Sequence, residues 1–172
     1  MDLQLAEHDP RWAVAFAAEA RRIGGVLGDC PIAWEHIGST AVPGLLAKPI
    51  VDMLGTTADL AAIDRLEGRF LALGYRAKGE NGIAGRRYFS RLEGAGPTGF
   101  HLHVFAHGSP HAERHLAFRD FLRVHPKVAA DYAERKRALR RAGATRAEYQ
   151  ERKAPFVREV EARALAWFRA GR

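Results

Sequence analysis

The spacing of apolar residues in the first third of the chain predicts one amphipathic helix followed by two strands. Between about residues 10 and 27 the apolar side chains recur at roughly helical spacing, namely Trp12, Phe16, Ile23 and Leu27. Residues 32–37 (IAWEHI) are typical of a short strand. Residues 49–55 (PIVDMLG) are almost continuously apolar, which indicates a strand buried on both faces, in the centre of a sheet.

The middle of the chain predicts a second helix and two more strands. Apolar residues at helical spacing between residues 60 and 73 indicate an amphipathic helix that ends at Gly74. After a glycine-rich turn, strands are expected near residues 86–92 (RRYFSRL) and at residues 100–105 (FHLHVF). The last of these alternates, so that one face carries Phe100, Leu102 and Val104 and the other carries His101 and His103.

The remainder of the chain is expected to be helical. Ser109-Pro110 is typical of a helix start, and His125-Pro126 is expected to separate that helix from a charged second one. Thr145 and Glu148 form a capping-box pattern for a last helix that reaches about residue 169. The order of elements predicts an α/β (α+β) fold, with a mixed sheet packed with helices and a C-terminal helical layer over about residues 110–169.

Composition indicates one domain. A chain of 172 residues with 47% apolar residues can form a single core, so residues 1–172 are expected to be one domain. No apolar run approaches the roughly 18 to 20 residues of a membrane span, and the first residues lack the order of a secretion signal, so we expect a cytoplasmic protein without membrane association. The single cysteine, Cys30, excludes an internal disulfide and cysteine-based zinc sites, and it is typical of core or turn filler.

The net charge of +7 lies in the C-terminal third. Residues 1–110 contain 11 Lys/Arg and 12 Asp/Glu, whereas residues 111–172 contain 16 and 8. Such a basic region attracts phosphate-bearing partners, either a nucleotide or RNA, although a solvated helical face has the same composition. Few aromatic residues lie among the basic ones, which makes RNA the less favoured partner.

Asp52 is an acid on an otherwise apolar strand. A carboxylate there is costly unless it is paired, hydrogen-bonded or bound to a metal, so we expect it at an open end of the sheet, in a cleft. Upstream, the Gly38-Ser39-Thr40 turn offers backbone N–H groups and two hydroxyls that suit a phosphate, although such turns also occur in ordinary loops. A Gly-Ser turn followed by 12 residues and a strand acid is the layout of nucleotidyltransferases.

Several segments together make this resemblance more specific. Over about residues 7–160 the chain resembles the GrpB family of nucleotidyltransferase-like proteins, in the segments HDPRW, HIGSTAVPGLLAKPIVDML, GIAGRRYF, HLHVF, GSPHAERHLAFRDFLR and YQERKAPFVREV. The resemblance implies a nucleotidyltransferase-like α/β fold. It does not assign a reaction, and the sequence contains no P-loop, GxSxG elbow or HExxH zinc motif.

The metal-binding pattern of active nucleotidyltransferases is incomplete here, because Leu54 stands where a second acid would lie. His101 and His103 can complete a site beside Asp52 if the two strands are neighbours. Two histidines and a carboxylate suit Zn²⁺, Mn²⁺ or Fe²⁺ better than Mg²⁺, which prefers oxygen. The nucleotidyltransferase resemblance itself implies Mg²⁺, so the cofactor expected is a divalent metal, Mg²⁺, Mn²⁺ or Zn²⁺. The alternative is that both histidines are polar residues on an exposed strand face.

The other charged residues and histidines are expected either to hold a phosphate or to have structural or surface positions. Lys48 and Arg87 are candidates for holding a phosphate. Arg119 is expected to form a buried ion pair with Asp120 or a neighbour. His36 fits either the cleft or, more simply, the core. Solvated or surface positions are expected for the remaining candidates, Lys136, Lys153, His107, His111, His115 and His125.

The leading hypothesis is a protein that binds a nucleotide or other phosphorylated small molecule and transfers a nucleotidyl or phosphoryl group with the help of a metal. Catalysis is assigned to Asp52 and His103, and metal binding to Asp52, His101 and His103. Phosphate binding is assigned to Gly38, Ser39, Thr40, Lys48 and Arg87. The alternatives are a non-catalytic module for a nucleotide or CoA-type ligand, and RNA binding through the basic C-terminal helices.

Overall fold

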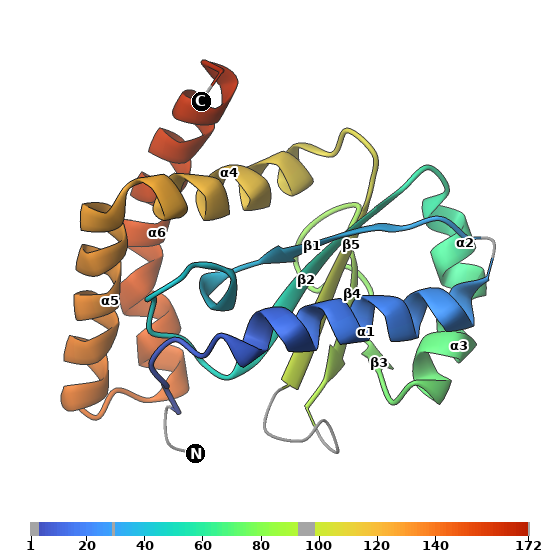
Figure 1. The fold of residues 1–172 in the computed structure, drawn as a ribbon, viewed down its shortest axis with the longest axis horizontal. Helices are drawn as coiled ribbons and strands as arrows, with labels where there is room; N and C mark the ends of the chain where they lie inside the picture. The colour runs from blue at the N-terminus through green and yellow to red at the C-terminus, as the bar shows by residue number, and fades with distance from the viewer. Residues whose placement is uncertain (1–3, 29, 93–98, 172) are drawn as a thin grey trace.

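The fold is a five-stranded mixed sheet with helices packed around it (Figure 1). The computed structural model describes residues 4–28, 30–92 and 99–171. In the order β1-β2-β5-β4-β3, the central strands β2 and β5 run parallel and all other neighbours run antiparallel. The strands are β1 (Ala33–Ile37), β2 (Ile50–Thr57), β3 (Arg76–Ala77), β4 (Arg87–Arg91) and β5 (Gly99–Ala106). The predicted mixed sheet is confirmed, with the two-residue β3 as the strand that the pattern did not predict.

One face of the sheet is covered by α1 (Arg11–Leu27), which runs across the front of the sheet in Figure 1, together with α2 (Leu60–Arg65) and α3 (Glu67–Ala72). The alternating apolar residues of β5 lie on this face at 0 to 5% exposure, namely Phe100, Leu102 and Val104, whereas Phe105 packs on the other face. The alternation predicted for β5 is therefore confirmed, and its two histidines are left on the other face.

The single helix predicted between residues 60 and 73 is divided in the structure. Leu66 departs from helical geometry, with φ −96° and ψ 6°, and it separates α2 from α3. Ile63 and Phe70, on either side of this break, are both completely buried in the core. The apolar spacing thus identified the residues that contact the core, but it could not indicate the local turn between them.

The C-terminal helices gather beside one end of the sheet, at the left and top of Figure 1, as α4 (Pro110–Val124), α5 (Pro126–Arg141) and α6 (Arg146–Arg169). They form a second core with the segment that leads into β2, through residues such as Leu46, Phe121, Tyr132 and Val160. The predicted boundary at His125-Pro126 and the capping box of Thr145 and Glu148 are confirmed.

Arg119, a buried residue of α4, links the helical layer to the edge strand of the sheet. Arg119 donates from Nε to Asp120 Oδ1 at 2.7 Å and from a terminal nitrogen to Glu35 Oε2 of β1 at 2.6 Å. The predicted ion pair of Arg119 is thus confirmed, and it extends to the edge strand. Within the described part of the chain, no helix is both long enough and apolar enough to cross a membrane.

Candidate functional site

The second face of the sheet brings Asp52 together with both histidines of β5. Because β2 and β5 are parallel neighbours, Asp52 lies opposite His101 and Leu54 lies opposite His103. His101 Nδ1 is 3.2 Å and His103 Nε2 is 3.3 Å from the same oxygen, Asp52 Oδ1. The two strands are therefore adjacent, as a site shared by Asp52 and the two histidines requires.

The Asp52 carboxylate is ionised and partly accessible. Burial would raise its pKa, but the hydrogen bonds from His101 and His103 outweigh burial and hold the pKa of Asp52 below its ordinary value. Its side chain is 29% exposed. One ligand atom from each of the three residues lies within 4.8 Å of the other two, and this nitrogen and oxygen set fits one divalent transition-metal cation.

Gly38 packs directly against this carboxylate. Its backbone, with φ 72° and ψ −171°, is in a region that is essentially open to glycine alone. A Cβ at this position would lie 2.6 Å from Asp52 Oδ2, closer than a Cβ atom approaches other atoms in proteins. The Gly-Ser turn therefore depends on glycine both for its backbone geometry and for the close approach to Asp52.

The two hydroxyls of the turn have different neighbours. Thr40 Oγ1 lies 2.9 Å from His36 Nε2, and both residues are buried. Burial lowers the pKa of His36 to about 4, and its ring stacks on Phe16, so His36 is a neutral core histidine. Ser39 Oγ faces the helical layer and accepts a hydrogen bond of 2.6 Å from Lys136 Nζ.

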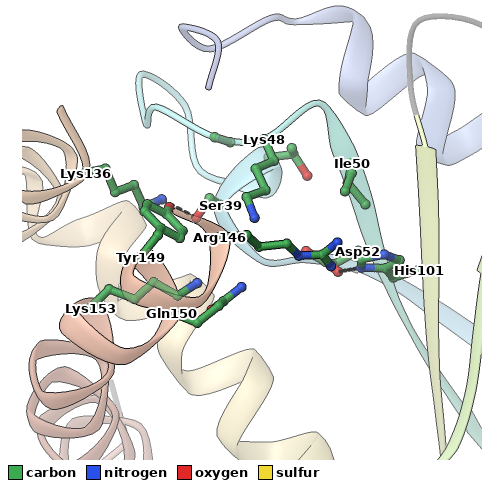
Figure 2. Close-up of a pocket in the computed structure, with 12 residues that line it drawn as sticks. Ser39, Lys48, Ile50, Asp52, His101, Lys136, Arg146, Tyr149, Gln150 and Lys153 are labelled. Carbon is green, nitrogen blue, oxygen red and sulfur yellow. Dashed lines mark hydrogen bonds and ion pairs between the residues drawn. The ribbon is translucent and has the colours of Figure 1, made fainter. Parts of the chain in front are cut away.

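A hollow of about 230 Å³ opens between this turn, the ends of β2 and β5, and the C-terminal helices (Figure 2). Four cationic side chains and one carboxylate line it. Figure 2 shows that Arg146, at the start of α6, extends across the hollow toward Asp52. The lining residues are Ser39, Thr40, Ala47, Lys48, Ile50, Asp52, His101, Lys136, Arg146, Tyr149, Gln150 and Lys153.

Lys136 is buried, so its predicted solvated position is wrong. Its exposure is 1%, because α5 turns the aliphatic stem into the second core and the amine reaches across to the Gly-Ser turn. Besides Ser39, the amine donates to Leu46 O at 2.8 Å and lies 4.0 Å from the centre of the Tyr132 ring. Burial lowers the pKa of Lys136 well below its ordinary value, and repulsion from Lys153 adds to this effect.

Two further amines meet at Tyr149. Lys48 Nζ and Lys153 Nζ lie 5.1 and 5.0 Å from the centre of its ring. Burial lowers the pKa of both lysines, and nearby cations lower it further, Arg146 in the case of Lys48 and Lys48 in the case of Lys153. The predicted solvated position of Lys153 is therefore also wrong, because this side chain is half-buried in the wall of the hollow.

The structure does not bring Arg87 to the hollow. Arg87 lies opposite Val104 on the α1 face of the sheet, where its guanidinium donates to Asp64 at 2.5 and 2.8 Å. The preceding residue, Arg86, faces the other way and lies 3.3 Å from His103 Nδ1. Leu54, at the position of the missing acid, is fully buried among apolar residues.

Sequence reasoning missed several residues around the site. Arg146 and Gln150, which the sequence analysis did not single out, line the hollow from one side of α6 together with Lys153. The spacing of four and three residues among these positions is the signal that could have revealed them. His115, predicted to lie on the surface, instead has a buried Nε2 atom that finds no hydrogen-bond partner among the described residues, and its ring centre lies 5.3 Å from that of His103. Burial lowers the pKa of His115 to about 3, so it is neutral at physiological pH.

Known proteins support the fold independently. The crystal structure of the conserved protein GrpB from Enterococcus faecalis is 34% identical, with a TM-score of 0.88 over 96% of this chain and 99% of that one. The Cid1 poly(U) polymerase with MgGTP bound is 13% identical and has a TM-score of 0.52 over 77% of this chain and 46% of that one, a likeness of fold alone. The sheet and helices therefore form a nucleotidyltransferase-like fold.

Sequence relatives identify the family. The UPF0157 protein YqkA of Bacillus subtilis is 43% identical over 137 residues, which are 80% of this chain and 39% of YqkA, so the match spans well under half of that relative. The family model described as GrpB protein matches residues 2–163. On these matches and on the structural similarity, the chain belongs to the GrpB family.

Proposed function

We propose that the hollow binds a nucleotide or another small molecule that carries more than one phosphate. The observation that carries this proposal is the charge of its lining, in which four cationic side chains face a single carboxylate. Amines that are partly or wholly withdrawn from water without an acidic partner have lowered pKa values, and an anionic ligand supplies the missing counter-charge. A polyphosphate group has the charge and the acceptor oxygens to do so.

The residues of the chain have distinct roles in this proposal. Lys136 holds Ser39 in place by its hydrogen bond, while Lys48 and Lys153, which lie beside the Tyr149 ring in the lining of the hollow, would contact the phosphates. Arg146 can reach both the phosphates and the region of Asp52. When bound, a divalent cation at Asp52, His101 and His103 would offset negative charge on the phosphate oxygens.

The finer hypothesis is that a nucleotidyl or phosphoryl group is transferred, with Asp52 and His103 at the reacting end. The MgGTP bound by the distant relative Cid1 supports a nucleotide with a cation in this fold. One observation favours the alternative of a non-catalytic module for a nucleotide or CoA-type ligand. Leu54 is 1% exposed in an apolar cluster, so the position of a second metal-binding acid is closed.

A thermal-shift panel combined with product analysis tests the proposal. Nucleoside triphosphates and CoA would each be added with and without Mn²⁺. A ligand at 100 times its Kd stabilises the folded state by about 2.7 kcal/mol, which corresponds to a rise in Tm of about 5 to 10 °C for a chain of this size. Release of pyrophosphate or phosphate then separates a transferase from a binding module.

Two variants make this panel specific. Lys136→Met removes a cation from the hollow and is expected to abolish the ligand-induced shift, whereas Arg87→Ala removes a cation from the opposite face and is expected to retain it. An identical shift in both variants would show that the ligand binds elsewhere. If no phosphate compound shifts the wild-type Tm while RNA binds with a steep salt dependence, the third hypothesis replaces this one.

A further inference from the structure

Arg86 is a buried arginine beside the group formed by Asp52, His101 and His103. It is 5% exposed, and its guanidinium donates from Nε to Glu80 O at 3.0 Å and from a terminal nitrogen to Asn81 O at 2.6 Å. It also lies over the Tyr88 ring, 4.7 Å from the ring centre. These contacts hold the guanidinium in one orientation, in which the other terminal nitrogen lies 3.3 Å from His103 Nδ1.

The chemistry of these groups determines where the hydrogen of His103 lies. A guanidinium is only a donor, so its partner Nδ1 must accept through a lone pair. The hydrogen of the neutral imidazole is then on Nε2, because the tautomer is set by the hydrogen bond that the other nitrogen makes. Nε2 is the atom that lies 3.3 Å from Asp52 Oδ1, so it donates to the carboxylate.

We propose that Arg86 is a positioning residue that keeps His103 in the tautomer with hydrogen on Nε2, so that His103 orients Asp52 by a hydrogen bond and does not bind the cation. The chain Arg86, His103, Asp52 then runs in one direction, each member donating to the next. Such outer contacts commonly orient a metal-binding carboxylate.

This assignment changes the kind of cation site. The part that concerns the cation rests on the proposed function. With the Nε2 lone pair of His103 replaced by N–H, the chain supplies Asp52 and His101, and the remaining ligands are phosphate oxygens and water. His101 differs from His103 because its hydrogen bond within the described part of the chain is the one to Asp52, so no donor fixes its tautomer and its ring can present a lone pair to the cation. A set rich in oxygen favours Mn²⁺ or Mg²⁺ over tetrahedral Zn²⁺.

Long-range ¹H–¹⁵N NMR of the histidine rings tests the tautomer directly, without any ligand. We expect the His103 Nδ1 of the wild-type protein at pH 8 to have the chemical shift of an unprotonated nitrogen, and Nε2 that of a protonated one. The His103→Gln variant assigns the signals. Arg86→Met is expected to produce a mixture of tautomers, and Arg86→Lys, which keeps a donor, to restore the wild-type form in part. Hydrogen on Nδ1, or on both nitrogens, in the wild-type protein would overturn the proposal.

Mn²⁺ binding by a matched pair of variants tests the consequence. Glutamine carries an N–H close to the position of Nε2, so His103→Gln keeps the donor to Asp52 and its Mn²⁺ affinity should fall by less than about tenfold. His101→Gln loses a metal ligand, so its Mn²⁺ affinity should fall by more than about a hundredfold. Equal losses in the two variants would overturn the proposal. If the wild-type protein binds no Mn²⁺, the cation site fails together with that part of the proposed function, and the NMR result alone decides the role of Arg86.

Discussion

The substitution Gly38→Ala tests how closely the Gly-Ser turn and the Asp52 carboxylate depend on each other. The added Cβ would lie 2.6 Å from Asp52 Oδ2 and 3.2 Å from Asp52 Cβ, so either the turn or the carboxylate must move. The backbone of Gly38, with φ 72° and ψ −171°, adds a strain of about 1 to 3 kcal/mol for a residue with a side chain.

Two measurements follow from this geometry. The clash adds to the strain, and overpacking costs about 1 to 3 kcal/mol, so urea denaturation should show a total loss of about 2 to 6 kcal/mol in the free energy of unfolding. Displacement of the carboxylate breaks its alignment with His101 and His103, so Mn²⁺ affinity should fall by at least about tenfold.

Gly44→Ala is the matched control. Gly44 follows the same turn and has φ 76°, but apart from its chain neighbours no atom of the described residues lies within 4 Å of the Cβ that alanine would add. This variant should lose stability through backbone strain alone, by about 1 to 2 kcal/mol, and keep its Mn²⁺ affinity. If Gly38→Ala and Gly44→Ala have the same stability and the same Mn²⁺ affinity, the inference that the turn supports Asp52 is refuted.

Three further predictions concern Lys136, His36 and Arg87. Binding of ATP at pH 8 should take up protons, because the anion raises the lowered pKa values of the lysines in the hollow. Calorimetry in buffers of different ionisation enthalpy measures this uptake, which should be smaller in Lys136→Met than in the wild type. Equal uptake in the two proteins would contradict this account. The pKa of the His36 imidazole is about 4 in the folded chain and about 6.5 in the unfolded chain. Between pH 6.5 and pH 4, therefore, only the unfolded chain binds this proton. The free energy of unfolding should then fall by up to about 1.4 kcal/mol per pH unit as the pH decreases from 6.5 to 4. Urea denaturation should show a shallower fall in His36→Gln, and an unchanged slope would argue against a neutral buried imidazole. Arg87→Ala loses an exposed ion pair with Asp64, so it should lower the free energy of unfolding by at most about 1 kcal/mol. Its affinity for ATP should equal that of the wild type, and a lower affinity in calorimetry would place Arg87 near the ligand.

The parts of the site that sequence could predict are those set by strand periodicity. An apolar run with one acid predicted the central strand of Asp52, and alternation placed both histidines of β5 on the same face. Periodicity could not decide between Arg86 and Arg87, because a shift of one residue in register exchanges the two faces of a strand. The pairing of β4 with β5 decides it.

The burial of Lys136 in the lining of the hollow could not be predicted from the sequence, for a different reason. The sequence of α5 is so rich in charge that each lysine in it is expected to be solvated. The burial of Lys136 arises only when α5 packs near Ser39, a residue 97 positions earlier in the chain. Contacts over such a separation have no local pattern in the sequence, so the tertiary structure is needed to recognise this side chain.

The central claim is that one hollow binds phosphates through its cations and a divalent ion through Asp52. Calorimetric titration of ATP into the wild-type protein and Asp52→Asn, each with and without Mn²⁺, tests it most directly. We predict a single site in the wild-type protein that is tighter with Mn²⁺, and a variant that keeps the metal-free affinity but loses the gain from Mn²⁺. A wild-type protein that does not bind ATP, or a variant that gains as much from Mn²⁺ as the wild type does, would contradict the account.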